Sequence, residues 1–345
     1  MKPRRINLAL QGGGAHGAFT WGVLDHLLNE PKIEIAAISG TSAGALNGAA
    51  LKAGMVSGGR QAARENLDWL WAQMGAVKDS RFAQWMGQGL PGFEHFTQML
   101  GPFSPQSMAE AVGRIFSPYD FGPFYTNPLQ DIAARFSYDQ ICHSEGPALF
   151  IAATNVRSGK IRVFSNEDIS AQAILASACL PNLFQAVEIT DPTTGKTDAY
   201  WDGGYAGNPA LFPLFDSALP NDIVIVNINP LERGTLPRSA QDIQNRINEI
   251  SFNSSLFREL RAIQFVKDLL AHGQVKPGAM KDVYIHMVAD DELMNRLNAT
   301  TKMMAGPALL AELKQAGQDT AEAFLSAHMG DINKRGSVDL RAMFA

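Results

Sequence analysis

The segment GTSAG at residues 40–44 constrains the fold most, because it joins a predicted buried strand to a predicted helix. Residues 33–39 (IEIAAIS) form a short apolar run, typical of a parallel strand buried on both faces. The run after the segment is rich in Ala and Leu and predicts a helix. Gly40 and Gly44 lack a Cβ and permit a tight turn that exposes the Ser42 hydroxyl. The pattern is typical of a nucleophile elbow, although a strand–helix turn without chemistry has the same residues.

A glycine-rich segment lies near the start of the chain. Residues 6–10 (INLAL) predict a strand, and QGGGAHG follows at residues 11–17. Gly12, Gly13 and Gly14 stand in succession, so their backbone N–H groups can line a concave loop that binds negative charge. The following residues predict a helix with one apolar face. The sequence thus begins with two strand–turn–helix units, the start of a parallel sheet.

The third motif is Asp202-Gly203-Gly204, which follows a strand-like stretch. Two glycines after an acidic residue let its carboxylate approach another backbone closely. A carboxylate in such a position can act as a general base. The sequence separation between Asp202 and Ser42 does not show that they touch, so any contact depends on the fold.

Glycine loop, elbow and Asp-Gly-Gly, in that order, resemble the motifs of the patatin-like phospholipase family. A fourth block at residues 176–184 (ASACLPNLF) is similar to the family's Ala-Ser-x-Ala-x-Pro-x-x-Phe segment. The resemblance covers about residues 6–210. It implies a three-layer α/β/α fold with a central, mostly parallel sheet, and the activity of a bacterial serine acyl hydrolase.

The resemblance also implies the roles of individual residues. Ser42 would be the nucleophile and Asp202 the proton acceptor of a Ser–Asp dyad. The backbone of residues 12–14 would form the oxyanion hole. Many members of the family carry Arg where this chain has His16, so the role of that Arg as an anchoring charge does not carry over.

The implied reaction is hydrolysis of an acyl ester, with release of a fatty acid from a phospholipid or lysophospholipid through an acyl-enzyme. Such a reaction needs no metal and no organic cofactor. An acyltransferase would use the same acyl-enzyme but pass the acyl group to an alcohol or thiol. A scaffold that keeps the motifs without catalysis is a further alternative.

A dinucleotide-binding enzyme is a distant alternative. Gly12, Gly14 and Gly17 fit the spacing GxGxxG between a strand and a helix. That fingerprint requires an acidic residue at the end of the second strand, to bind a ribose hydroxyl. Here the strand ends in SGTS at residues 39–42, without an acidic residue. A nicotinamide or flavin cofactor is therefore not expected.

Histidine and metal chemistry have little support in the sequence. His16 lies in the glycine loop, where hydrogen bonding at the helix start is expected. The other histidines stand in no catalytic motif: His26, His95, His143, His272, His286 and His328. No HExxH or paired Cys/His spacing predicts a metal site, and residues 290–292 predict a solvated helix start.

Composition limits the class of protein. A chain of 345 residues with 46% hydrophobic residues can bury one large core, so residues 1–345 are expected to form a single α/β domain. The net charge of −5 argues against a nucleic-acid partner. Two cysteines make no disulfide framework. The apolar runs are too short for a signal peptide or a membrane span, so we expect a cytoplasmic protein with any membrane contact peripheral. The sequence gives no indication of the oligomeric state.

Two regions outside the motifs have a distinct character. Residues 80–126 are dense in Phe, Met, Gly and Pro. They predict a lid or one wall of an acyl pocket, with ordinary packing of a loop-rich insertion as the alternative. The part from about residue 239 is expected to be largely helical, with a helix over 240–271 broken near residues 253–254 and a last helix over 307–329.

Overall fold

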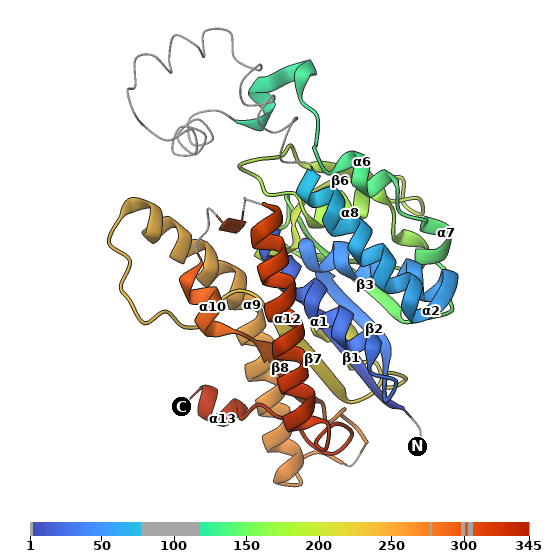
Figure 1. Ribbon diagram of the computed structural model, residues 1–345, viewed down its shortest axis with the longest axis vertical. Helices are drawn as coiled ribbons and strands as arrows, with labels where there is room; N and C mark the ends of the chain where they lie inside the picture. Colours follow the sequence, from blue (N-terminus) through green and yellow to red (C-terminus); the bar gives the residue numbers. More distant parts are fainter. Residues whose placement is uncertain (1–2, 77–116, 277, 298–300, 303–305, 345) are drawn as a thin grey trace.

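The computed structural model describes residues 3–76, 117–276, 278–297, 301–302 and 306–344. A central sheet is covered by helices on both faces (Figure 1), which confirms the predicted three-layer fold. The sheet of the described residues has eight strands in the order β5-β6-β3-β2-β1-β7-β8, with β4 also paired to β3.

The sheet is mostly parallel, as predicted. The parallel strands are β1 (Arg4–Leu10), β2 (Ile33–Thr41), β3 (Ala148–Asn155), β7 (Asp222–Asn227) and β8 (Tyr284–Ala289). The antiparallel strands at one side are β4 (Ile161–Ser165), β5 (Val187–Thr190) and β6 (Thr197–Asp202).

The central strands are apolar on both faces because helices cover both. Leu8 and Leu10 of β1 pack into one hydrophobic cluster together with Val224 of β7. Ala9 and Ile225 point to the opposite cluster. This alternation is the period of two that a strand imposes on its side chains. A strand buried on both faces therefore reads as an unbroken apolar run in the sequence.

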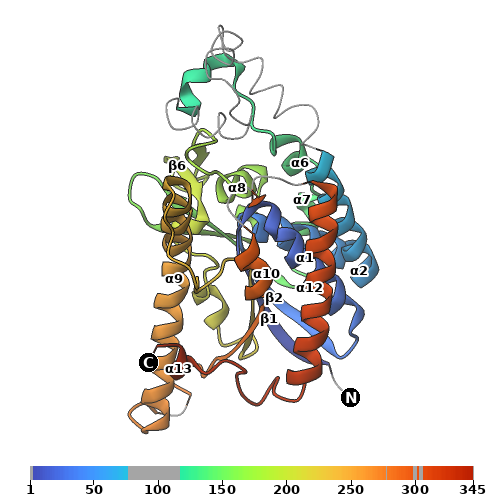
Figure 2. The same ribbon diagram turned by 60° about the vertical axis from the view of Figure 1, so that its left-hand side comes forward.

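The helices fall into two groups, on either side of the strands in Figure 2. One face is covered by α1 (Gly17–Asn29), α2 (Ala43–Ala76), α6 (Gln130–Ala134), α7 (Tyr138–Ile141), α8 (Ala171–Ser177) and α12 (Pro307–His328). The other face is covered by α9 (Ala240–Ala271), with α13 (Leu340–Met343) against it, and α10 (Asp291–Arg296) follows β8. Short 3-10 turns are η1 (Gly14–His16), η2 (Pro118–Phe124), η3 (Asn166–Asp168), η4 (Gly203–Tyr205) and η5 (Phe212–Phe215).

One detail of the helices differs from the sequence predictions. Helix α9 continues through Asn253 and Ser254 without a break, so the predicted interruption is wrong. Asn253 is buried and its side chain donates to the carbonyl of Pro230, so tertiary contacts hold a residue that would otherwise favour a turn. Helix α2 is interrupted by non-helical backbone at Gly58 and Gly59. Most of the predicted lid, its residues 80–116, lies outside the described residues.

In the described part of the chain, no helix combines the length and hydropathy that crossing a bilayer requires. The functional motifs all lie at the carboxyl ends of β1, β2 and β6. Because β1 and β2 are parallel neighbours, the loops after them meet at one edge of the sheet. Ligands of open α/β sheets bind at this edge.

Candidate active site

The predicted turn at Ser42 is present between β2 and α2. Ser42 has φ 55°, the left-handed region that a residue other than glycine seldom adopts. The glycines on both sides are required by close backbone contacts. A Cβ on Gly40 would lie 2.5 Å from the Gly44 carbonyl oxygen, and one on Gly44 would lie 2.2 Å from the Leu10 carbonyl oxygen. The strained turn leaves Ser42 partly exposed at the start of a helix.

Hydrogen bonds to distant segments hold the elbow in place. The Ser42 N–H donates to Ser177 Oγ at 2.9 Å, and Ser177 is the last residue of α8. The Thr41 hydroxyl donates to the Gly207 carbonyl oxygen at 2.7 Å. In the sequence, Ser177 was only one residue of the block at 176–184, and no pattern indicated its hydrogen bond to Ser42. Its role in fixing the Ser42 backbone required the fold.

Sheet register brings Asp202 close to the elbow. Thr41 at the end of β2 pairs with Ala152 of β3, and Asp202 at the end of β6 pairs with Ala153 of the same strand. Only β3 lies between the strands that end at the serine and at the carboxylate, although these two residues lie far apart in the sequence. A Cβ on Gly203 would lie 2.2 Å from the Ala152 carbonyl oxygen, so glycine lets the turn after Asp202 pack directly on β3.

Asp202 has a buried carboxyl group, and one of its two oxygens accepts no hydrogen bond from a described residue. Its side chain is 1% exposed, and Oδ1 accepts a hydrogen bond of 2.7 Å from the Gly204 N–H. Oδ2 has no formed hydrogen bond to any described residue. Burial raises the pKa of Asp202 to about 7, while the Gly204 N–H and the Ser42 side chain oppose this rise in pKa. A carboxylate of such basicity, beside a serine hydroxyl, can accept its proton.

The glycine loop lies directly against the elbow. A Cβ on Gly12 would lie 2.7 Å from Ser42 Cβ, so this glycine is needed for the close approach. The Gly12 N–H donates to Asn208 Oδ1 at 2.7 Å and is therefore not free for an oxyanion. The N–H groups of Gly13 and Gly14 have no acceptor among the described residues. Gly14 has φ 58°, a conformation that favours glycine.

A buried amide network supports this loop. Gln11 Oε1 accepts from the backbone N–H groups of Ile228 at 2.8 Å and Asn229 at 3.0 Å. The Asn229 side chain donates to the Gly12 carbonyl oxygen at 2.8 Å. The side chains of Gln11, Asn208 and Asn229 are fully buried, so these hydrogen bonds satisfy polar groups that water does not reach. No sequence pattern predicted the network, because its members come from three separate loops.

His16 is buried and does not cap a helix. Its side chain makes no hydrogen bond to the start of α1, so the predicted capping role is wrong. Instead Nε2 lies 2.8 Å from the Thr301 hydroxyl oxygen. Burial lowers the pKa of His16 to about 3, and the positive charges of Lys302 and Arg233 act in the same direction. An imidazole of such low pKa is a poor proton acceptor.

Replacing His16 by Ala is expected to leave ester hydrolysis within about tenfold of wild type, because the neutral ring serves packing. Removal of the buried ring should lower the free energy of unfolding by on the order of 2 kcal/mol. Rates with a soluble ester and urea denaturation measure the two effects. A loss of activity comparable to that of Ser42→Ala would instead place His16 in the catalytic machinery.

One other histidine lies between a serine and an acid, but far from the elbow. His286 Nε2 is 3.0 Å from Asp222 Oδ1, and Nδ1 is 3.1 Å from Ser337 Oγ. Asp222 begins β7, whereas the glycine loop follows the end of the parallel strand β1. The pair therefore lies at the opposite edge of the sheet and stabilises the core. No cluster of three or more potential metal ligands occurs in the described ranges.

The arrangement contains the parts of a serine acyl-transfer site. These are a partly exposed hydroxyl on a strained turn, a buried carboxyl group with raised pKa, and the N–H groups of Gly13 and Gly14, which have no acceptor in the described part of the chain. Comparison with protein families gives a match to the patatin-like phospholipase model over residues 8–215. The chain belongs to the patatin-like phospholipase family, whose members are lipid hydrolases.

Solved structures similar to the chain include two bacterial proteins. VipD from Legionella pneumophila is 16% identical with a TM-score of 0.42, and the match covers 94% of this chain and 67% of VipD. ExoU, in its complex with SpcU from the type III secretion system of Pseudomonas aeruginosa, is 17% identical with a TM-score of 0.37. That match covers 95% of this chain and 52% of ExoU, so the chain spans about half of ExoU's length. Comparison with curated proteins gives no match.

Proposed function

We propose that the protein is a serine acyl hydrolase that releases a fatty acid from a phospholipid or lysophospholipid. The observation that carries this proposal is the position of the partly exposed Ser42 next to the buried, basic carboxyl group of Asp202. Family membership supports lipid hydrolysis in general. The dyad, the acyl-enzyme and the substrate class are our inferences from the geometry.

Ser42 Oγ attacks the ester carbonyl carbon, and its proton passes to Asp202 Oδ2. The carbonyl oxygen becomes an oxyanion, for which the N–H groups of Gly13 and Gly14 are the proposed donors. When the tetrahedral intermediate collapses, the bond to the leaving alcohol breaks and Asp202 returns the proton to that alcohol. A water molecule then attacks the acyl-enzyme and gives its proton to Asp202, and the second collapse releases the fatty acid and restores Ser42.

The described end of the predicted acyl-pocket wall, residues 117–126, makes hydrogen bonds with the chain after the block at 176–184. The Gln185 N–H donates to the Tyr125 hydroxyl at 3.1 Å, and the Ala186 N–H donates to the Tyr119 hydroxyl at 3.0 Å. Residues 117–125 are thus held against the chain that follows the block at 176–184. We propose that the region 80–126 supplies one wall of the acyl pocket within one patatin-like domain, a role for which residues 80–116 lie outside the described part of the chain.

Fatty-acid release from a panel of lipids tests the proposed function. Wild-type protein should release free fatty acid from at least one phospholipid or lysophospholipid. An excess of a competing alcohol distinguishes hydrolysis from acyl transfer, because both use the same acyl-enzyme. Transfer product in excess of free fatty acid would favour the acyltransferase. No release from any acyl ester would contradict both.

The proposed base predicts a specific pH dependence. Asp202 must be ionised to accept the proton, and its pKa is about 7. The rate constant kcat/KM should therefore rise about tenfold per pH unit below this value and level off above it. A soluble ester assayed across the range measures it. A flat profile down to about pH 5 would show that a carboxyl group of raised pKa is not the base.

A further inference from the structure

Three cations surround one buried carboxylate close to the glycine loop. Glu249 of α9 is 5% exposed and accepts from Arg233 through Nη2 at 2.6 Å and Nε at 3.1 Å. Arg246 Nη1 lies 3.4 Å from Glu249 Oε2, and Lys302 Nζ lies 3.8 Å from Oε1. We refer to Arg233, Arg246, Glu249 and Lys302 as the cationic cluster.

The cationic cluster holds more positive than negative charge. Three cations against one carboxylate leave a net charge of +2. The acidic residues nearby, Glu232 and Asp291, form no ion pair with the cluster in the described part of the chain. Burial lowers the pKa of Lys302 to about 8, Glu249 opposes this fall in pKa, and Arg233 adds to it. The excess of positive charge in the ion-pair geometry thus favours the approach of a further anion.

The cationic cluster is joined to the glycine loop. Lys302 Nζ donates to Asn229 Oδ1 at 2.8 Å, and Asn229 Nδ2 donates to the Gly12 carbonyl oxygen at 2.8 Å. The Lys302 carbonyl oxygen would lie 2.3 Å from a Cβ on Gly14. Lys302 therefore lies over the loop that contacts Ser42. Arg233 also donates to the carbonyl oxygen of Asn295 in α10. In Figure 2, α10 lies between α9 and α12.

Lys302 is the member that combines unused hydrogen-bonding capacity with contact to the glycine loop, whereas Arg246 donates to Glu249 and to the Leu231 carbonyl oxygen. Arg233 is held by Glu249 and by the carbonyl oxygens of Asn295 and Leu297. An ammonium group has three N–H donors. Within the described ranges, Asn229 is the single hydrogen-bond acceptor of Lys302 Nζ, and the Lys302 side chain is 18% exposed. An incoming anion can therefore reach this group.

We propose that the cationic cluster, through Lys302, binds the phosphate group of the substrate while its acyl ester lies at Ser42. This inference rests on the proposed function and names the part of the substrate that determines specificity. In a phospholipid, the phosphate is a few covalent bonds from the ester carbonyl, which suits a cation over the glycine loop. Phosphate oxygens are strong acceptors for charge-assisted hydrogen bonds from Lys and Arg.

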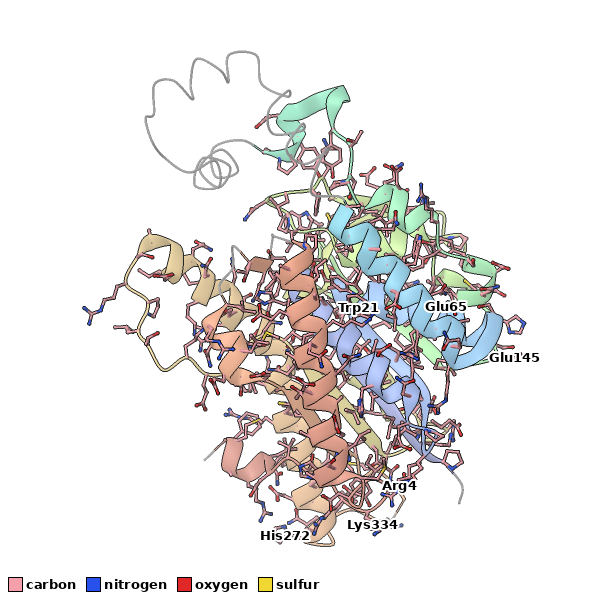
Figure 3. All side chains as sticks on the ribbon, viewed as in Figure 1. Arg4, Trp21, Glu65, Glu145, His272 and Lys334 are labelled. Carbon is pink, nitrogen blue, oxygen red and sulfur yellow. The ribbon has the colours of Figure 1, made fainter. Side chains whose placement is uncertain are left out.

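The test compares two esters that differ only in the phosphate, a short-chain lysophosphatidic acid and the monoacylglycerol with the same acyl chain. Wild-type protein should prefer the phosphorylated ester by kcat/KM. Lys302→Met should reduce that preference about tenfold, the value of one charge-assisted hydrogen bond. Lys302→Arg should retain most of it. Lys334→Met is the matched control, because Lys334 is exposed at the far end of the molecule (Figure 3).

The outcomes separate this inference from the proposed function. If both esters lose activity by the same factor in Lys302→Met, or if wild type shows no preference, the phosphate site is refuted while Ser42-dependent hydrolysis stands. If Ser42→Ala still hydrolyses both esters, the proposed function is refuted. Where Ser42→Ala protein is inactive, calorimetric binding of the two lipids to it tests the inference separately from catalysis, since equal affinities would refute it.

Free inorganic phosphate distinguishes a headgroup from a separate phosphate ligand. Headgroup binding predicts that phosphate competes with lysophosphatidic acid, raising its KM in wild type and less in Lys302→Met. If phosphate instead alters hydrolysis of the monoacylglycerol through Lys302, the cluster binds a regulatory anion, and the assignment to the substrate headgroup is wrong.

Discussion

Ser42→Ala protein is expected to release fatty acid at least about 10³-fold more slowly than wild type, because the attacking oxygen is removed. The substitution leaves the backbone and the neighbouring glycines unchanged. Alanine has no greater difficulty than serine at φ 55°, so the free energy of unfolding should change by less than about 1 kcal/mol. Fatty-acid release, a fluorophosphonate probe and thermal unfolding measure the three quantities. The probe should label wild type on Ser42 and leave the variant unlabelled.

Ser158→Ala is the matched control for this experiment. Ser158 lies exposed in the turn between β3 and β4 and bonds only to nearby residues of that turn. It should be labelled and active like wild type. Release of fatty acid by Ser42→Ala at a rate near wild type would assign the chemistry to another residue, and mass spectrometry of the labelled peptide would identify it.

Asp202→Asn is expected to reduce kcat/KM by about 10³-fold, because an amide cannot take the proton from Ser42. The shape of the side chain is kept, and the Oδ1 position can still accept from the Gly204 N–H. The steep rise of activity up to about pH 7 should also disappear from what activity remains. Asp198→Asn is the control on the same strand, since Asp198 pairs with Arg157 and Lys196 away from the elbow.

The same variant should change how stability depends on pH. The folded-state pKa of Asp202, about 7, lies above the unfolded value of about 3.9. The folded protein therefore holds this proton more tightly, and stability present below the unfolded pKa is lost as pH rises through the folded pKa. Between about pH 4 and pH 7, wild type should lose up to about 4 kcal/mol relative to Asp202→Asn. Urea denaturation at several pH values measures this difference. Parallel curves for the two proteins would mean that the carboxyl group is ionised without penalty.

Much of the fold was predictable because its signals are local. The apolar runs at β1, β2 and β7 and the helices that follow the first two are properties of neighbouring residues. The predictions were wrong where tertiary contacts outweighed the local preference of a residue. Asn253 was expected to interrupt α9, but its buried hydrogen bond to Pro230 keeps it helical. The His16 side chain was expected to hydrogen-bond to the helix start, but its ring contacts the Thr301 hydroxyl instead.

The candidate site was predictable as a set of motifs and not as a set of contacts. The glycine loop predicted three equivalent N–H donors, whereas Asn208 accepts the hydrogen bond of the first. Ser177, which holds the Ser42 backbone, and the amide of Asn229 gave no signal that could be separated from ordinary polar residues. Their roles depend on loops that meet only when the sheet has formed.

By itself the sequence determined the turn at Ser42, because Gly40 and Gly44 are the residues that a strained strand–helix junction requires. It also determined which residue types could supply a base and an anion-binding loop. The tertiary structure alone decided that Asp202 lies two strands from Ser42 and that Lys302 lies over the glycine loop. The reason is physical: sheet register and helix packing set distances between residues remote in sequence, and burial between them sets the pKa of Asp202.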